Sequence, residues 1–179
     1  MTPYGSAPPA ASGGATGGRP AGLVRRWCAL VYEAFLLFAL LLVAGFAVLP
    51  LMGPDLAGAG LSARQLYLLP TESSAFLFLY YVVVVGAYCI GLWSNGRRTL
   101  AMKTWRLGLV STGGLPLDTR HATMRYLAAW IGPAAGLAAY GALGKCGLAL
   151  VPLNYYWGWL DRDRQFLHDR IAGTRIILD

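Results

Sequence analysis

The sequence predicts an all-α membrane protein: a bundle of about four transmembrane helices, the last two short and hairpin-like, with a small cytoplasmic two-strand or amphipathic element. Three observations lead to this fold class. Hydrophobic residues make up 56% of the chain and charged residues only 13%, whereas charged residues reach about a quarter of an ordinary soluble domain. Four apolar segments follow one another along the chain. The basic residues between these segments alternate between rich and poor loops.

The N-terminal region is expected to be a disordered cytoplasmic tail over residues 1–22. It consists mainly of Gly, Ala, Pro, Ser and Thr and holds no long apolar run, a composition that cannot bury enough apolar surface to fold. We expect no signal peptide, because the apolar run 27–52 is longer than a signal core and ends without a small-x-small cleavage site. Residues 23–179 are expected to form one transmembrane domain.

The predicted spans cover, in chain order, residues 27–52, 75–93, 126–143 and 146–160. The first two are long enough to cross a hydrocarbon core of about 30 Å. The last two are short, and only Gly144 and Lys145 separate them. Residues 126–160 therefore form two full spans, a re-entrant hairpin or one long broken helix, with bends expected at Pro133 and Pro152.

The loop charges favour the hairpin, because Lys and Arg accumulate in short cytoplasmic loops. The segments outside the spans carry three, one, six, one and four basic residues in chain order. Four spans with both termini in the cytoplasm would leave this alternation. A single helix over 126–160 would be about 52 Å long at 1.5 Å per residue, so it would overshoot the bilayer and move the C-terminal arginines outside.

A short β-strand is predicted between the second and third spans. Trp105, Leu107 and Leu109 alternate with Thr104, Arg106, Gly108 and Val110, and a Gly-Gly turn signal follows. Residues 174–178 are a second strand-like segment that can pair with the first. The alternative is an amphipathic helix lying on anionic headgroups, because basic residues enter the same stretch. Strand pairing is the preferred interpretation.

The net charge of +7 does not indicate nucleic-acid binding, because the basic residues follow the loops and no strip interleaves them with aromatic residues. Each cysteine stands alone in an apolar stretch, so no disulfide or metal site is predicted. Aromatic residues concentrate where helices meet the membrane interface. Those expected to mark cytoplasmic boundaries are Trp27, Trp93, Tyr155, Tyr156, Trp157 and Trp159.

Glu33 is the only charged residue in the first predicted span, and an ionisable group there costs several kcal/mol unless it is paired. Arg26 lies seven residues earlier, on nearly the same helical face but about two turns away, and its guanidinium can instead extend to the headgroups. The charged stretch 161–170 is another source of partners. If that stretch folds back, Asp169 can meet Arg26; otherwise its alternating charges solvate a surface helix.

Three blocks of the sequence, residues 26–33, 96–106 and 165–174, resemble the signature regions of the RDD family of bacterial membrane proteins, named for one Arg and two Asp. Arg26 matches the family Arg, Glu33 stands where the first Asp is expected, and Asp169 matches the second Asp. Arg98 stands where Gln is usual, so a role for that amide is not expected.

The resemblance implies a compact bundle in the bacterial cytoplasmic (inner) membrane, with a functional polar cluster of Arg26, Glu33 and Asp169. We predict a structural or accessory role in which this cluster is a buried clasp, and in which another membrane protein or a second copy is the partner. The alternative is a proton-coupled transporter or exchanger of monovalent cations, with Glu33 as the proton carrier. The secondary candidates are polar residues of the blocks, namely Thr99, Lys103, His168 and Thr174.

No enzymatic activity and no cofactor are predicted. Cys28 near Glu33 invites a nucleophile, but His168 beside Asp169 reads as a solvated surface pair, no metal-ligand spacing occurs, and the serines lack a plausible base nearby. Besides the partners already considered, the lipid bilayer is the expected surrounding, and nucleic acid is not expected.

Overall fold

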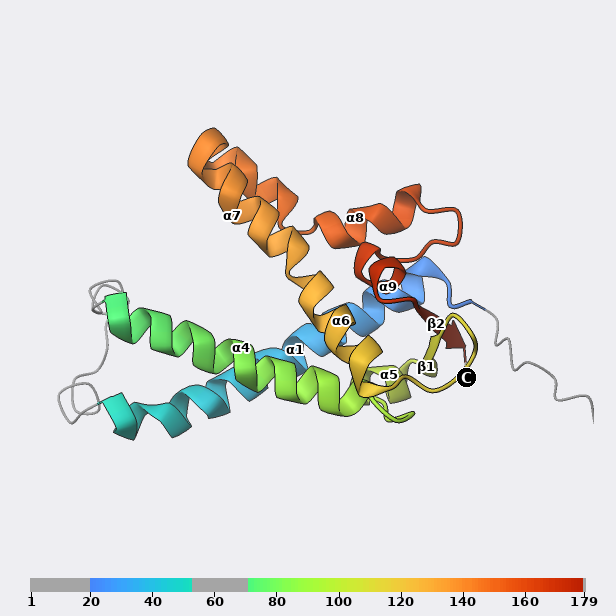
Figure 1. The fold of residues 1–179 in the computed structure, drawn as a ribbon, viewed down its shortest axis with the longest axis horizontal. Helices are drawn as coiled ribbons and strands as arrows, with labels where there is room; N and C mark the ends of the chain where they lie inside the picture. Colours follow the sequence, from blue (N-terminus) through green and yellow to red (C-terminus); the bar gives the residue numbers. More distant parts are fainter. Residues whose placement is uncertain (1–19, 53–70, 179) are drawn as a thin grey trace, which may run out of the picture.

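The computed structural model describes residues 20–52 and 71–178. These residues are mostly helical, with a small two-stranded sheet at one end (Figure 1). Residues 1–19 of the predicted tail lie outside the described residues. Ala21, however, is buried and its amide donates a 3.2 Å hydrogen bond to the carbonyl of Ile176. The tail boundary predicted at Gly22 is therefore wrong, because composition alone does not reveal that a short segment docks on a strand.

Two long apolar helices, α1 (Leu23–Val48) and α4 (Thr71–Trp93), lie side by side (Figure 1). The 3-10 helix η1 (Leu49–Met52) continues α1. The Tyr80 hydroxyl of α4 donates a 3.0 Å hydrogen bond to the Ala44 carbonyl of α1. Both helices begin four residues before the predicted spans, because a helix continues past its apolar stretch into the polar interface.

A short helix and the sheet follow α4. Helix α5 (Leu100–Thr104) is followed by strand β1 (Leu107–Ser111), which pairs antiparallel with β2 (Thr174–Leu178). The predicted strand pairing is confirmed, with Leu107 opposite Leu178. The first strand begins later than predicted because α5 ends at Thr104 and Arg106 then turns the chain with a φ of 52°.

The rest of the chain forms further helices, with bounds α6 (Thr119–Ala129), α7 (Ile131–Leu143), η2 (Gly144–Leu150), α8 (Leu153–Leu160) and α9 (Leu167–Ile171). The chain reverses at Gly144, whose φ is 57°, and the 3-10 helix η2 returns along α7 (Figure 1). The predicted fourth span, 146–160, is therefore not one continuous helix. It breaks before α8 at Pro152, which cannot donate an interior helical hydrogen bond.

Three helical stretches of the described residues are long and apolar enough to cross a membrane: Leu23–Val48, Ser74–Trp93 and Thr119–Leu150. The third contains α6, α7 and η2, and so includes the reversal. Glycines permit the close return of η2, because a Cβ at Gly147 would overlap the backbone of α7 and one at Gly136 would lie 2.5 Å from the Val151 side chain. Small residues allow such backbone contact between membrane helices.

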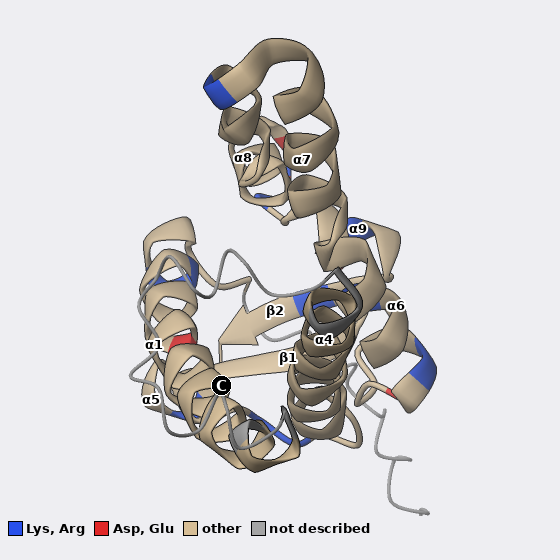
Figure 2. Cartoon of the chain, turned by 90° about the vertical axis from the view of Figure 1, so that its left-hand side faces the viewer, with Lys and Arg blue, Asp and Glu red and all other residues tan. Residues whose placement is uncertain are grey.

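The α7–η2 hairpin stands apart from α1 and α4 in two perpendicular views (Figures 1 and 2). The described helices therefore do not close into the compact bundle that the family resemblance implies. Trp130 separates α6 from α7. At this break the Asn154 amide of α8 donates hydrogen bonds of 3.3 and 2.7 Å to the carbonyls of Ala128 and Ala129.

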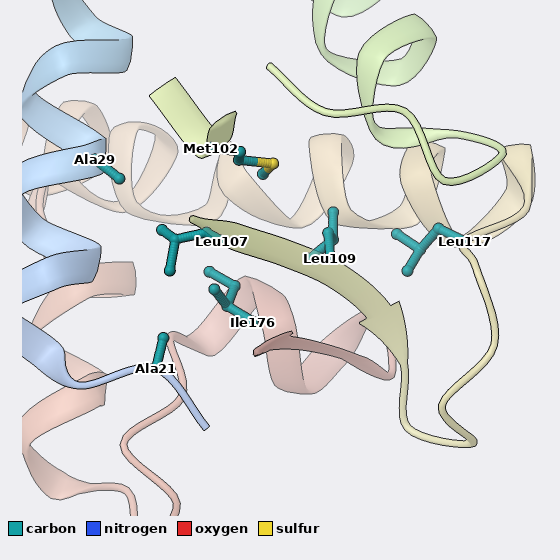
Figure 3. Close-up of a cluster of buried hydrophobic side chains, with 7 residues drawn as sticks. All are labelled: Ala21, Ala29, Met102, Leu107, Leu109, Leu117 and Ile176. Carbon is teal, nitrogen blue, oxygen red and sulfur yellow. The ribbon is translucent and has the colours of Figure 1, made fainter. Parts of the chain in front are cut away.

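A small hydrophobic core joins the sheet to α1 and α5 (Figure 3). Its side chains come from segments far apart in the sequence, so the two ends of the described chain fold as one unit. Most Lys and Arg residues lie around this end, near the sheet, α5, α6 and α9 (Figure 2). The core residues are Ala21, Ala29, Met102, Leu107, Leu109, Leu117 and Ile176.

Candidate functional site

A cavity of about 240 Å³ lies between α1, α4 and α6 and the elements around the sheet. Its walls are mostly apolar, with side chains such as Leu30 and Val85. The void far exceeds the space that one water molecule needs. Charged or titratable side chains from α1, α4, α6, α8 and α9 also reach it, namely Arg26, Glu33, Cys89, Arg125, Tyr126, Tyr155 and His168.

Glu33 is held by the middle block of the sequence. The Thr99 hydroxyl donates a 2.5 Å hydrogen bond to Glu33 Oε2 and accepts one of 3.2 Å from the Met102 amide, which caps α5. The hydroxyl of Tyr88 also lies near the carboxylate. Among the described residues, Glu33 Oε1 is buried without a hydrogen-bond partner. Thr99 therefore holds one oxygen of the acid, while the other is buried without a partner among the described residues, and Glu33 lines the cavity.

Arg26 binds backbone, not a carboxylate. Its side chain is 3% exposed, and it donates hydrogen bonds to the carbonyls of Arg164 (2.8 Å) and Ile176 (3.1 Å). The predicted pair of Arg26 with Asp169 is wrong, because strand β2 and the loop before α9 lie against the start of α1, while α9 faces α6. Within the described ranges, no Asp or Glu lies within ion-pair distance of Arg26.

Asp169 instead pairs with Arg125 of α6. Arg125 Nη1 donates to Asp169 Oδ1, and the two side chains are 5% and 0% exposed. The same nitrogen donates a 3.1 Å hydrogen bond to Thr174 Oγ1, and the Thr174 hydroxyl donates one of 3.3 Å to the Asp169 carbonyl. The Arg125 guanidinium carbon lies 4.9 Å from the centre of the Trp93 ring, within the range of a cation–π contact. This network ties α6 to α9 and β2.

His168 is buried, contrary to the prediction of a solvated pair. Its Nε2 lies 3.6 Å from Asp169 Oδ1, too far for a good hydrogen bond. Burial, with the nearby Arg125 charge as a second cause, lowers the pKa of His168 well below 6.5. The ring packs against Tyr155 and Phe166, with centroids 5.7 Å from each. His168 is therefore neutral at pH 7.

Residues 20–173 match the family model described as RDD family. The chain belongs to the RDD family. The match includes all the helices described above, from α1 to α9, and ends just before β2. No curated protein and no solved structure matches this RDD chain.

The secondary candidates of the RDD chain divide into two groups. Thr99, His168 and Thr174 are buried and contact or flank the polar groups just described. Lys103 is exposed on α5 and does not line the cavity. In the part of the chain that the structure describes, no group of three His, Cys, Asp or Glu side chains could hold a metal ion.

Sequence reasoning missed Arg125. It counted this residue among the loop charges before the third predicted span, but the helical stretch begins at Thr119 and includes it. The available signal was the argument applied to Glu33: an ionisable residue inside an apolar helix requires a partner. Only the three-dimensional structure shows that the partner is Asp169.

The neutral state of His168 predicts a pH dependence of stability. The unfolded chain takes up a proton near pH 6.5 while the folded protein does not, so stability is full above this pH and declines as the pH falls below it. We expect a loss of about 1 kcal/mol of unfolding free energy between pH 7.5 and 5.5. Thermal melting across this range should show the loss. His168→Phe should remove it and His121→Gln, at an exposed histidine, should not; an unchanged slope in His168→Phe would assign the loss to another group.

Proposed function

We propose that this RDD protein is a multi-pass protein of the bacterial cytoplasmic membrane that acts as a structural or accessory partner of another membrane protein or of a second copy. Its four passes are α1, α4, the α6–α7 arm and the returning η2–α8 arm, with both termini in the cytoplasm. The concentration of Lys and Arg around the sheet end supports this orientation (Figure 2), because basic residues favour the cytoplasmic side.

One observation carries the accessory role: the buried polar side chains are engaged in contacts that join membrane helices to segments outside them. Glu33 joins α1 to the start of α5 through Thr99. Arg26 joins α1 to β2, and Arg125 joins α6 to α9. Groups used in this way hold a fold together, since removing one partner leaves a buried polar group unpaired.

The separate α7–η2 hairpin supports the partner role. The hairpin stands apart from α1 and α4 (Figures 1 and 2), and several of its apolar side chains are exposed. These side chains are available to lipid or to the helices of another protein. Gly136 and Gly147 already allow close backbone contact within the hairpin, and small residues allow the same contact between membrane helices. The large exposed hydrophobic side chains of the hairpin are Ile131, Leu137, Tyr140, Leu143, Leu148 and Leu150.

A second function, proton-coupled exchange of monovalent cations, is favoured by one specific feature. Glu33 Oε1 is without a hydrogen-bond partner among the described residues and Glu33 lines the cavity, so a proton or cation that entered the cavity would meet a free carboxylate oxygen. Such a position suits a group that changes its charge during transport. We propose no catalytic role, since no nucleophile in the described cavity is paired with a base.

Glu33→Gln distinguishes the two functions. In the accessory role, purified wild-type protein in vesicles with an internal pH dye shows no pH change on addition of Na⁺, K⁺ or Li⁺. Glu33→Gln then lowers the unfolding free energy by about 1 kcal/mol, because a neutral amide accepts a weaker hydrogen bond from Thr99 than a carboxylate does. Glu33→Leu, which removes the acceptor, lowers it further.

The transport function has the opposite signature. Cation-dependent pH changes would then occur with the wild type, and Glu33→Gln would abolish them. Thr99→Ser is the matched control for both arms, because it keeps the hydroxyl that binds Glu33.

A further inference from the structure

A second cavity, of about 360 Å³, lies on the sheet side of Arg26. Arg26 forms part of its wall, and the exposed residues Arg162, Arg164 and Arg175 surround it, with Asp163 as the acidic lining residue. In the described part of the chain, none of the four arginines has a carboxylate within ion-pair distance. Among the described residues, the cavity therefore has a positively charged lining, with four arginines and one carboxylate.

The loop that carries two of these arginines is held in place. The Asp161 carboxylate accepts hydrogen bonds from the amides of Asp163 (3.2 Å) and Gln165 (2.9 Å), and it binds the Arg170 guanidinium at 2.7 Å. The carbonyl of Arg164 accepts the 2.8 Å hydrogen bond from buried Arg26. The Asp161 carboxylate is thus occupied by contacts within its own segment. These contacts and the Arg26 hydrogen bond hold the backbone that carries Arg162 and Arg164.

Two exposed apolar side chains lie within two residues of lining residues of this cavity. Val24, two residues after the lining residue Gly22, is 78% exposed, and Leu160, two residues before Arg162, is 80% exposed. The start of α1 and the end of α8 lie together, because the rings of Trp27 and Trp159 stack with centroids 5.8 Å apart. A ligand that fits this surface has an anionic group for the arginines and apolar chains beside it.

We propose that this cavity binds the phosphate group of an anionic phospholipid of the inner leaflet, with its acyl chains along Val24 and Leu160. Guanidinium groups suit phosphate because their planar donors bind its oxygens in pairs. Arginines next to the start of a membrane helix meet the anionic lipids of the cytoplasmic leaflet. The assignment rests on the membrane orientation proposed above, but on neither the accessory nor the transport role.

Lipid titration of the full-length protein in detergent tests this site, with bound lipid counted by native mass spectrometry. We expect one phosphatidylglycerol to bind well below the concentration at which phosphatidylcholine binds. The triple variant Arg162→Gln/Arg164→Gln/Arg175→Gln should weaken phosphatidylglycerol binding by at least about tenfold. The matched control Arg97→Gln/Arg106→Gln/Arg120→Gln removes the same charge from exposed positions outside the cavity and should bind as the wild type does.

Three outcomes would overturn the proposal: equal binding of the two lipids, equal weakening in both triple variants, or full displacement of phosphatidylglycerol by millimolar inorganic phosphate, which would make this a site for a soluble anion. If the triple variant melts at a lower temperature than the wild type, lipid binding is measured with the single variant Arg175→Gln instead. The Arg175 side chain is exposed on β2, so its replacement should not disturb the fold. A several-fold weakening in it supports the site, and wild-type binding refutes it. Vesicle exchange assays are independent of all these results.

Discussion

Asp169→Ala should lower the free energy of unfolding by about 3–5 kcal/mol, because it leaves the Arg125 guanidinium buried without its carboxylate. Both side chains are almost fully buried, and arginine cannot escape the cost by losing its proton. The loss should appear in detergent as a lower melting temperature and a smaller folded fraction on size exclusion. Asp163→Asn, at an exposed carboxylate of the same segment, should stay within about 0.5 kcal/mol of the wild type.

A double variant separates the pair from the general cost of mutation at this site. Arg125→Met/Asp169→Leu replaces both charges with apolar side chains, and such replacements of buried ion pairs are often neutral or stabilising. We expect the double variant to be more stable than Asp169→Ala. Wild-type melting of Asp169→Ala would show that the Arg125 contact contributes nothing to the fold, and would remove the main support for the accessory role.

Gly147→Ala should destabilise the α7–η2 hairpin by about 1–3 kcal/mol or more, since an added methyl group forces closely packed segments apart. A Cβ at Gly147 would overlap the backbone of Ala139 and Tyr140, which cannot rotate away as a side chain can. Thermal melting of the purified protein measures the effect.

The matched control for this glycine lies in the same hairpin. A Cβ at Gly141 would have nothing within 4 Å, so Gly141→Ala should be neutral or slightly stabilising, because alanine favours helix more than glycine does. If Gly147→Ala and Gly141→Ala lose similar amounts of stability, the loss does not come from the backbone contact at Gly147. The close packing of η2 on α7 would then be contradicted.

The elements with a local signal could be predicted. Continuous apolar runs indicated α1 and α4, and alternation about Leu107 and Leu109 indicated the first strand. The form of the 126–160 region could not be predicted in the same way. Its reversal depends on the positive φ of Gly144 and on backbone contact at Gly147, and both are properties of the folded hairpin that composition does not carry.

For the candidate site, the sequence identified polar residues but not their partners. Arg26 and Glu33 were placed on one helical face, and both do line the same cavity. Their contacts come from segments whose approach is set by the sheet: Thr99 reaches Glu33 just before α5, and β2 brings the Ile176 carbonyl to Arg26. Charge matching favoured an Arg26–Asp169 pair, whereas the fold satisfies Arg26 with uncharged carbonyl groups.

The Thr99 hydroxyl has a single hydrogen, and Glu33 receives it, while the oxygen is occupied by the Met102 amide. Any gain or loss of charge on Glu33 is therefore felt at the first turn of α5, which leads directly into β1. A change in the charge of Glu33 would then affect the strand pair that follows α5, without any long-distance movement of the helices. This hydroxyl is the contact that joins Glu33 of α1 to the first turn of α5.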